Sequence, residues 1–499
     1  MYQCPSCDKT GKVLDDFAQC QERNHNTPLY YDDKKEKTST KNQKSKEQLV
    51  TKKIKGRIGS YFVESILVDE KPFFLCYNYD DGRITIRESI SAEYAIVKPL
   101  EIHDYGYPPY KFSRSEVESL MNSPLQKEAI LDQILDQINK FLVLEERDKY
   151  LIMADILLSY YQEQVSTLHY PFFVGETESG KSSAIHMFRC MAYRCLYGED
   201  IPNADIYNFL GTDEEGAGTI AEDEAQEISR NREKIRMYKN SYAKGSVKAR
   251  MVITSNSKKQ FYYKPFGLKV FAGEKIPEDK GFRERLAIVK MVEGSPISNI
   301  KRASEQEKSD LNKLRNMLLI FKVQNIGKAV PKIDSKLRQR DQELWEDFLA
   351  IVSDTKHYEK CKETVKYYTE QRHETISNSL EASLFKILIK SLDIDLSVRL
   401  EAFWQYLVSS DELPGNLEKE TYYPNDFSSK ITRNFLSKLF ESKFQAKRKT
   451  RYHTENGKKH MRSVYEFDGN VIEILKRKYR ISEEESKCNG GKGGQLVLD

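Results

Sequence analysis

One glycine-rich segment carries the clearest chemistry in the chain. Residues 175–182 have the sequence Gly-Glu-Thr-Glu-Ser-Gly-Lys-Ser, the GxxxxGK[ST] spacing of a phosphate-binding loop. Glycines let backbone amides wrap phosphate oxygens, the Lys181 ammonium can reach the β- and γ-phosphates, and the Ser182 hydroxyl can bind Mg²⁺. The predicted nucleotide site consists of Gly175, Glu176, Thr177, Glu178, Ser179, Gly180, Lys181, Ser182 and Ser183.

The flanking sequence supplies the elements that must position this loop. Residues 170–174, Tyr-Pro-Phe-Phe-Val, form an apolar run of strand length, and a helix-compatible stretch begins at Ser183. A strand, a loop and the N-terminus of a helix are the context in which such a loop binds phosphates, because the helix adds positive potential.

An acidic pair follows at the end of a weakly apolar run, 217–221. Asp223 would hold the Mg²⁺ shell, and Glu224 would activate the attacking water, as hydrolysis of a γ-phosphate requires. The same pair could instead form an acidic surface turn.

Two further signals lie downstream of the acidic pair. Residues 250–256, Arg-Met-Val-Ile-Thr-Ser-Asn, predict another short buried strand, at whose end Asn256 could orient the water or could simply form a turn. Arg283 and Arg285 precede yet another apolar run, and one of them could neutralise charge on the γ-phosphate of a neighbouring subunit.

The first residues of the chain suggest a metal site. Cys4, Cys7, Cys20 and His25 offer three thiolates and one imidazole, the tetrahedral set that a structural Zn²⁺ accepts. Free thiols are the alternative. Eight cysteines in 499 residues are too few for a disulfide scaffold, which favours a reducing, cytoplasmic location.

Basic residues are concentrated in two segments. Residues 34–57 carry ten Lys or Arg against two acids and have the composition of a linker. Residues 443–462 carry eight Lys or Arg against one acid, and they follow an amphipathic helix predicted over 428–440. A helix followed by a basic hairpin is the winged helix-turn-helix layout, whose wing would contact DNA phosphates through Lys447, Arg448, Lys449 and Arg451. A solvated basic hairpin is the alternative.

Length and composition limit the remaining possibilities. A chain of 499 residues is long enough for several hydrophobic cores. Its net charge of +4 is nearly balanced, so a nucleic-acid surface must be a local patch. No apolar stretch approaches 18 residues, and the start lacks a signal-peptide pattern, so we expect a soluble intracellular protein without a membrane partner.

These signals divide the chain into eight segments. We expect a zinc module over 1–33, a basic linker over 34–57, a small β-rich domain over 58–110 and a helical collar over 111–165. An ATPase core over 166–300, a helical region over 301–400, a winged helix over 401–482 and a disordered tail over 483–499 would follow.

In this order the motifs resemble those of AAA+ ATPases, and among them the hexameric replication helicases of mobile elements, viruses and archaea (superfamily 3 and minichromosome-maintenance-like enzymes). Residues 175–182 match the Walker A loop, Asp223 and Glu224 match Walker B, Asn256 matches sensor 1, and Arg283 or Arg285 matches the arginine finger. Residues 240–250 resemble the hairpin before sensor 1, whose DNA-gripping residues would be Lys244, Lys248 and Arg250. A sensor 2 motif is missing from the pattern.

The resemblance implies a multidomain α+β and α/β protein with an AAA+ P-loop core and a C-terminal winged helix. It further implies an ATP-dependent DNA helicase or translocase in DNA replication, hydrolysing ATP between subunits of a homo-hexameric ring. ATP, Mg²⁺ and Zn²⁺ would be its cofactors and DNA its partner. The alternative is an ATP-gated DNA-binding loader or regulator that does not unwind processively.

Overall fold

The computed structural model describes residues 49–93, 95–101, 106–211, 215–254, 257–427, 429–455 and 458–481. It also gives the backbone of four short strands, β1 (Tyr2–Gln3), β2 (Thr10–Leu14), β3 (Phe17–Gln19) and β4 (Asn26–Pro28). The predicted zinc ligands Cys4, Cys7, Cys20 and His25 lie outside the described residues. The chain divides into two compact units, unit one over 1–366 and unit two over 367–499.

A β module opens the continuous part of unit one. It contains β5 (Leu49–Lys53), β6 (Lys55–Ile58), β7 (Tyr61–Val68), β8 (Lys71–Asn78), β9 (Ile84–Arg87), β10 (Ile90–Ser91), β11 (Ala95–Pro99) and β12 (Lys111–Phe112). Strands β7, β8 and β9 pair antiparallel, as the alternating pattern predicts. Gly82 takes a φ of +70° in the turn before β9. Val63, Phe74 and Cys76 form the buried centre of the module.

Three helices follow the β module: α1 (Arg114–Asn122), α2 (Lys127–Phe141) and α3 (Glu146–Ser159). Ser113 caps α1 and forms a capping box with Glu116. Ile130, Ile134 and Ile138 are all buried on one face of α2, as their four-residue spacing predicts.

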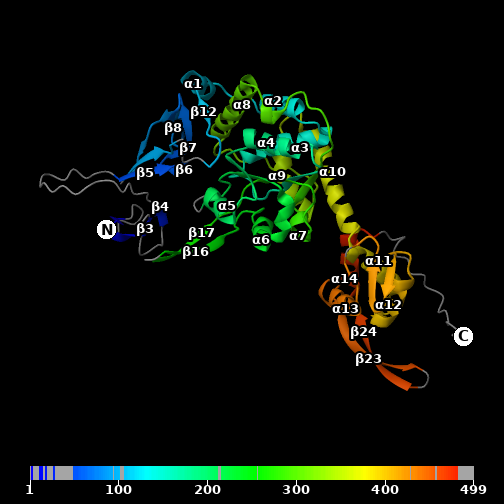
Figure 1. Cartoon of the computed structure of the whole chain (residues 1–499). Coiled ribbons are helices and arrows are strands. Elements are labelled where there is room, and N and C mark those ends of the chain that lie inside the picture. The colour runs from blue at the N-terminus through cyan, green and yellow to red at the C-terminus, as the bar shows by residue number, and fades with distance from the viewer. Residues whose placement is uncertain are drawn as a thin grey trace. The chain divides into compact units, whose positions relative to one another are not determined.

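A parallel five-stranded sheet forms the centre of unit one (Figure 1). Its strands are β13 (Tyr170–Val174), β14 (Cys195–Glu199), β15 (Thr219–Asp223), β18 (Lys269–Gly273) and β19 (Leu286–Lys290), in the order β14-β15-β18-β13-β19. Helices α4 (Lys181–Met191), α5 (Asn203–Leu210), α6 (Arg232–Asn240) and α7 (Lys280–Arg283) connect and cover these strands. Because all five strands run parallel, their carboxyl ends meet at one edge of the sheet, which we call the phosphate edge.

The buried strand predicted over 250–256 is wrong. Residues of that segment form β16 (Lys248–Thr254), which pairs with β17 (Ser257–Tyr263) in a separate two-stranded hairpin. The place between β15 and β13 is taken by β18 instead. A short apolar run does not distinguish a core strand from a strand of a separate hairpin, because its length suits both settings. Asn256 itself lies outside the described residues, so its role stays a prediction.

Two helices complete unit one, α8 (Glu305–Gln324) and α9 (Gln339–Ala350), and α10 (Tyr358–Ser377) crosses the boundary to unit two. Helix α8 joins the β module to the part of unit one that contains the parallel sheet through a buried ion-pair network. Lys322 Nζ lies 3.1 Å from an oxygen of Glu64 and 3.1 Å from an oxygen of Glu163, and Lys55 Nζ lies 2.5 Å from Glu163. Tyr193 donates a hydrogen bond of 2.5 Å to Glu64.

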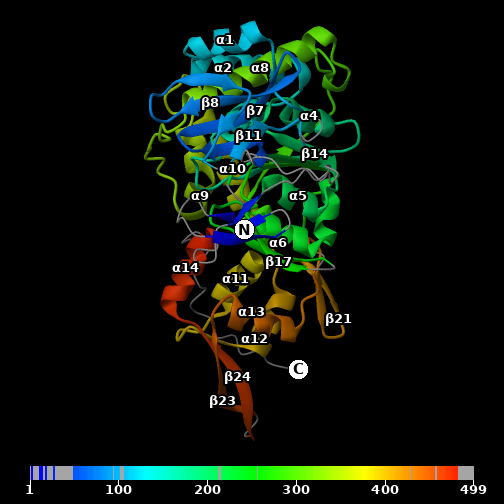
Figure 2. The ribbon, with the colours of Figure 1, turned by 90° about the vertical axis from the view of Figure 1, so that its left-hand side faces the viewer.

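Unit two has a core of its own that extends from Leu380 to Tyr479. Its elements are α11 (Leu380–Ser391), β20 (Ser397–Arg399), α12 (Leu400–Ser409), β21 (Gly415–Glu418), β22 (Thr421–Pro424), α13 (Arg433–Ser442), β23 (Lys447–Glu455), β24 (Lys458–Glu466) and α14 (Gly469–Tyr479). Strands β20, β24 and β23 form one sheet, and β23 and β24 extend as a long hairpin away from the helices of this unit (Figure 2).

Within the described residues, none of the helices combines the length and the apolar character needed to cross a membrane.

Candidate nucleotide site and DNA-binding surfaces

The glycine-rich loop lies between β13 and α4, as predicted. Gly180 takes a φ of +88° at the start of α4, a conformation that L side chains rarely adopt. At Gly175, a Cβ atom would lie 2.6 Å from the Met291 carbonyl oxygen and 2.6 Å from Ser179 Oγ. Glycine is therefore favoured at Gly180 by the backbone conformation and at Gly175 by the close approach of Met291 and Ser179.

The polar groups of this loop suit a phosphate ligand with its metal. Lys181 Nζ lies 2.8 Å from the carbonyl oxygen of Gly175 and 2.5 Å from that of Glu176, so the ammonium group lies against the loop. The buried Ser179 Oγ has no hydrogen-bond partner in the described part of the chain. Ser182 and Ser183 lie in the first turn of α4, where the Ser183 backbone amide donates a 3.0 Å hydrogen bond to the Gly180 carbonyl oxygen. ATP and Mg²⁺ thus fit the donors and oxygens present.

The acidic pair lies on the same edge of the sheet. Strand β15 ends at Asp223, which is 6% exposed and accepts a 3.1 Å hydrogen bond from the Glu224 backbone amide. Glu224 has φ 56° and ψ 33°, a left-handed conformation that costs a non-glycine residue roughly 1–3 kcal/mol. One strand separates β15 from β13, so the two strands lie about 10 Å apart. That spacing leaves room for a metal ion and a water between the acids and the phosphate loop.

The middle strand adds an acid that the sequence motifs did not single out. Glu274 directly follows β18, and its carboxylate accepts a 3.2 Å hydrogen bond from Thr177 Oγ1 in the phosphate loop. The available signal was the apolar run 270–273 followed by an acidic residue, the same pattern that marks Asp223.

The neighbouring Glu222 belongs to the core and not to the edge. It is buried, accepts a hydrogen bond of 2.6 Å from Tyr238 and forms an ion pair with the buried Lys234. Burial raises the pKa of Glu222 despite the adjacent Lys234 ammonium. Glu222 therefore belongs to the core, whereas Asp223 ends β15 and Glu224 follows it at the edge of the sheet.

The two candidate finger arginines differ in their surroundings. The Arg285 side chain is buried, its guanidinium lies 4.4 Å from the ring centre of Tyr242, and it donates a hydrogen bond to the Gly281 carbonyl oxygen. Burial and the nearby Arg340 lower the pKa of Arg285. Arg283, in α7, is half-buried. These contacts favour Arg283 for an interaction outside its own chain.

The hairpin predicted over 240–250 is wrong in its position. Helix α6 ends at Asn240, and the hairpin consists of β16 and β17, beginning at Lys248. Lys244 therefore precedes the hairpin, where its Nζ donates a 2.7 Å hydrogen bond to the Glu163 carbonyl oxygen and burial lowers its pKa. Lys248 forms a 3.1 Å ion pair with Glu233, and Arg250 is exposed on β16. The three predicted DNA contacts thus do not share one element.

The basic hairpin of unit two lies where the sequence predicts it, on β23 and β24. Arg448 donates a 3.0 Å hydrogen bond to Ser463 Oγ, and Lys447 is exposed. Lys449 and Arg451 are both ion-paired with Glu466, at 2.6 Å and 2.5 Å, and Arg451 also pairs with Asp395 at 3.1 Å. Hydrogen bonds from Lys449 and Arg451 lower the pKa of Glu466. Two of the four predicted phosphate contacts are therefore neutralised within unit two itself.

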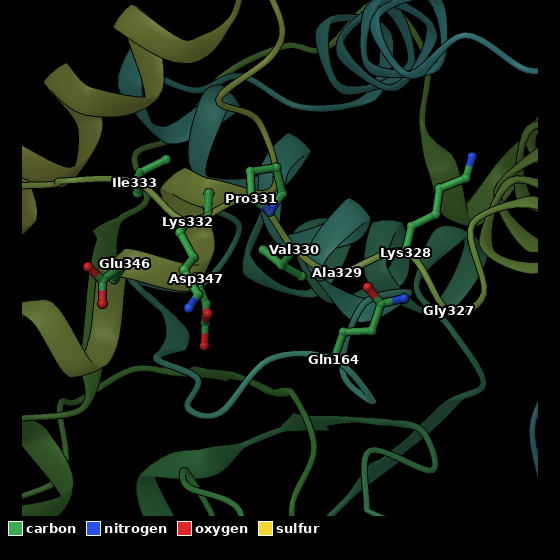
Figure 3. A pocket seen from close by; sticks show the side chains of 11 residues that line it. Gln164, Gly327, Lys328, Ala329, Val330, Pro331, Lys332, Ile333, Glu346 and Asp347 are labelled. Atoms are coloured by element: carbon green, nitrogen blue, oxygen red, sulfur yellow. The ribbon is translucent and has the colours of Figure 1, made fainter.

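A pocket of about 640 Å³ lies elsewhere in unit one, between the 327–333 loop and α9 (Figure 3). Glu346 and Asp347 of α9 and Gln164 complete its wall. Asp347 accepts a 2.8 Å hydrogen bond from the Ser166 backbone amide, so this carboxylate holds the 165–167 turn against α9. None of the predicted site residues belongs to this pocket.

No protein-family model matches the chain, and no curated protein matches it either. Among solved structures, the chain is similar to the apo A form of the NrS-1 C-terminal region, with 11% identity and a TM-score of 0.32 over 81% of this chain and 96% of that one. It is also similar to Cch of SCCmec type IV, described as an active helicase, with 13% identity and a TM-score of 0.35 over 78% of this chain and 80% of that one. Chains this different can differ in activity, so the functional assignment depends on the residues at the phosphate edge.

Proposed function

We propose that this chain is an ATP-driven DNA translocase or helicase that acts in DNA replication. The observation that carries the proposal is the phosphate edge, where a glycine-rich loop, Lys181 and the Asp223–Glu224 pair meet at the ends of neighbouring parallel strands. A loop for phosphates together with an acid for water is the minimum for hydrolysing a γ-phosphate.

In this proposal each residue of the edge has one task. Backbone amides of the loop and Lys181 hold the phosphates, and Ser182 and Asp223 would hold Mg²⁺. Bound Mg²⁺ would neutralise charge on the phosphate oxygens. Glu224 orients and deprotonates the attacking water. Its left-handed backbone, which directs the residue away from the line of β15, is the kind of strain that accumulates at functional positions.

Hydrolysis between subunits of a ring, with six as the expected number, completes the proposal. An arginine that acts on the phosphate of a neighbouring chain needs a guanidinium group that is not buried against residues of its own chain. Arg283 meets that requirement better than Arg285, whose guanidinium is buried against Tyr242.

DNA is the proposed partner of two hairpins. In unit one, β16 and β17 carry Lys248, Arg250, Lys258 and Lys259. In unit two, the order α11, β20, α12, α13, β23 and β24, with β20 beside β24, is that of a winged helix with the hairpin β21–β22 inserted between α12 and α13. In this layout α13 would enter the major groove. Lys447 and Arg448 are then the phosphate contacts of the wing, because Lys449 and Arg451 are ion-paired.

Strand displacement tests the proposal against the alternative of an ATP-gated loader or regulator. The full chain, supplied with ATP and Mg²⁺, should separate a forked duplex, and Lys181→Ala should not, since its phosphates lose their ammonium partner. DNA-stimulated ATP hydrolysis without strand separation on any fork would favour the loader. Absence of ATP hydrolysis under all conditions would contradict both.

A further inference from the structure

A second basic site lies between the β module and the ATPase core of unit one. It is a pocket of about 390 Å³. Arg57, Phe62 and Tyr79 of the β module form one wall, and Lys244 and Lys264 of the core form part of the other. None of the proposed hairpin contacts lines this pocket, so the two hairpins do not account for it.

The walls of this pocket are held in fixed positions. Lys322 of α8 pairs with Glu64 of β7 and with Glu163, whose carboxylate also pairs with Lys55 of β6. This buried network ties the β module to the core directly behind the pocket. A site with preformed walls loses little conformational entropy when a ligand binds.

The charge of the pocket favours an anion. Glu163 lines it, but the ammonium groups of Lys322 and Lys55 outweigh the effect of burial and lower the pKa of Glu163 to about 2, so its charge is already balanced. Glu215 accepts a 2.6 Å hydrogen bond from the Gly245 backbone amide. The charges of Glu215 and Glu163 also act on the Lys244 ammonium. The lining nevertheless carries three cations, Arg57, Lys244 and Lys264, against these two acids.

The pocket also contains an aromatic surface. Tyr79 is 43% exposed, and the Arg57 guanidinium lies 5.0 Å from its ring centre. An exposed aromatic ring beside cations is the combination on which single-stranded nucleic acids stack their bases. A paired base in a duplex has no free face for such a ring, and a volume of about 390 Å³ has room for one nucleotide but not for a double helix.

We propose that this pocket binds one nucleotide unit of single-stranded DNA, with its phosphate near Arg57 and Lys244 and its base on Tyr79. The inference deepens the proposed translocase, because it places a strand between the β module and the core. The same chemistry could come from a free nucleotide, so the test below includes both ligands.

Fluorescence anisotropy with an oligo(dT) strand, without ATP and over a range of salt concentrations, separates the two contacts. Arg57→Ala should lower the slope of log affinity against log salt by about 0.7, the contribution of one phosphate on a single strand. Tyr79→Ala should weaken binding about fivefold to tenfold and leave the slope unchanged, because it removes stacking and no charge. Tyr79→Phe keeps the ring and should bind like the original protein.

The β module offers a matched control. Arg87 lies 4.8 Å from the ring centre of Tyr61, the same kind of pair as Arg57 and Tyr79, but outside the pocket. Arg87→Ala should change neither the affinity nor the salt slope. The melting temperature of every variant reports on its folding, and Arg57→Lys, which keeps the charge, should restore the slope if Arg57→Ala is destabilised.

Three outcomes would overturn the proposal. One is an unchanged salt slope in a folded Arg57→Ala variant, and another is equal loss of binding in Tyr79→Phe and Tyr79→Ala. The third is competition by thymidine monophosphate as effective as by the same concentration of oligonucleotide phosphate, which would identify a site for free nucleotides. Because these measurements use no ATP, a failed ATPase or unwinding assay would count against the proposed function and not against the pocket.

Discussion

The phosphate edge of unit one and the basic hairpin of unit two both carry charged residues that the sequence predicts, but they use them differently. At the phosphate edge, strand ends and glycines fix each group, and Asp223 is nearly buried. On the hairpin, Lys449 and Arg451 are exposed and bind acids of the same unit. A buried charge has few possible partners, so removing its partner should strongly change stability or activity. An exposed charge competes with water and salt, so each contributes little.

The largest effect should follow from Glu224→Gln. The amide cannot take a proton from water, so turnover should fall about 100-fold to 1,000-fold while ATP binding remains, because general-base catalysis contributes on that order. Steady-state hydrolysis measures the turnover, and equilibrium titration measures the ATP affinity. Glu233→Gln, at an exposed acid paired with Lys248, is the control and should hydrolyse ATP normally. Near-normal turnover in Glu224→Gln would move the catalytic base elsewhere.

Lys322→Met tests how strongly buried charges act in unit one. The variant leaves Glu64 and Glu163 without their shared ammonium, which should lower the free energy of unfolding by about 3 kcal/mol at pH 7. Chemical denaturation measures this loss. Lys308→Met, on the same helix but in an exposed pair with Glu305, should change stability by less than about 1 kcal/mol. Equal effects of the two substitutions would remove the contrast between buried and exposed charges.

The same variant has a defined pH dependence. The pKa of Glu163 is lowered to about 2 from 4.5, so in the original protein its stabilising contribution is complete above pH 4.5 and is lost as the pH falls toward 2. In Lys322→Met the loss of the Lys322 ammonium destabilises the fold only while the Glu163 carboxylate is ionised. The difference in stability between the two proteins should therefore shrink below about pH 4.5, as repeated denaturation at pH 7 and pH 4 would reveal.

Glu274→Gln sharpens the description of the phosphate edge. Glu274 contacts Thr177 of the loop, so the loss of its charge should reduce turnover about tenfold with little change in KM, if it helps to orient the water. Thr177→Val removes the other partner of this hydrogen bond and should have a smaller effect. Tighter ATP binding with unchanged turnover would instead mean that Glu274 only repels the phosphates.

The hairpin of unit two should respond in smaller steps. Arg448→Ala should weaken duplex binding about threefold and lower the salt slope by about 0.9, the value for one phosphate contact on duplex DNA. Lys449→Ala should do less, because Glu466 already holds that ammonium. Glu466→Gln should tighten DNA binding by releasing Lys449 and Arg451. Filter binding at several salt concentrations measures these affinities. Equal losses of DNA affinity in Arg448→Ala and Lys449→Ala would contradict the idea that the ion pair with Glu466 keeps Lys449 from DNA.

The smallest effect on ATP hydrolysis is expected from Cys7→Ser. If Cys4, Cys7, Cys20 and His25 hold one ion, metal analysis should find about one Zn²⁺ per chain, and this substitution should remove it. The ATPase rate should not change, because the phosphate edge contains none of these residues. A chain prepared without chelators that contains no Zn²⁺ would leave free thiols as the interpretation.

The sequence by itself determined the local features of the protein. The strand over 170–174 has the bounds that the sequence predicts, and the loop and the helix follow it in the predicted order. The helix begins at Lys181, two residues before the predicted start. The cap at Ser113 and the four-residue spacing of the buried isoleucines of α2 are local features of the same kind. Each of these features depends on residues within one or two turns or strands of each other, and spacing in the chain specifies such contacts directly.

Only the tertiary structure decided which distant segments meet. A run of apolar residues does not tell whether it joins a central sheet, and here β18 took the place expected for 250–256 and brought Glu274 to the loop. A count of charges does not tell which are paired, and here Glu466 pairs with both Lys449 and Arg451, and Asp395 pairs with Arg451. Packing of the β module against the rest of unit one also brings Lys244 and Arg57 to the same pocket. Strand order and ion pairing are set by packing between residues far apart in the chain, and local spacing does not encode that packing.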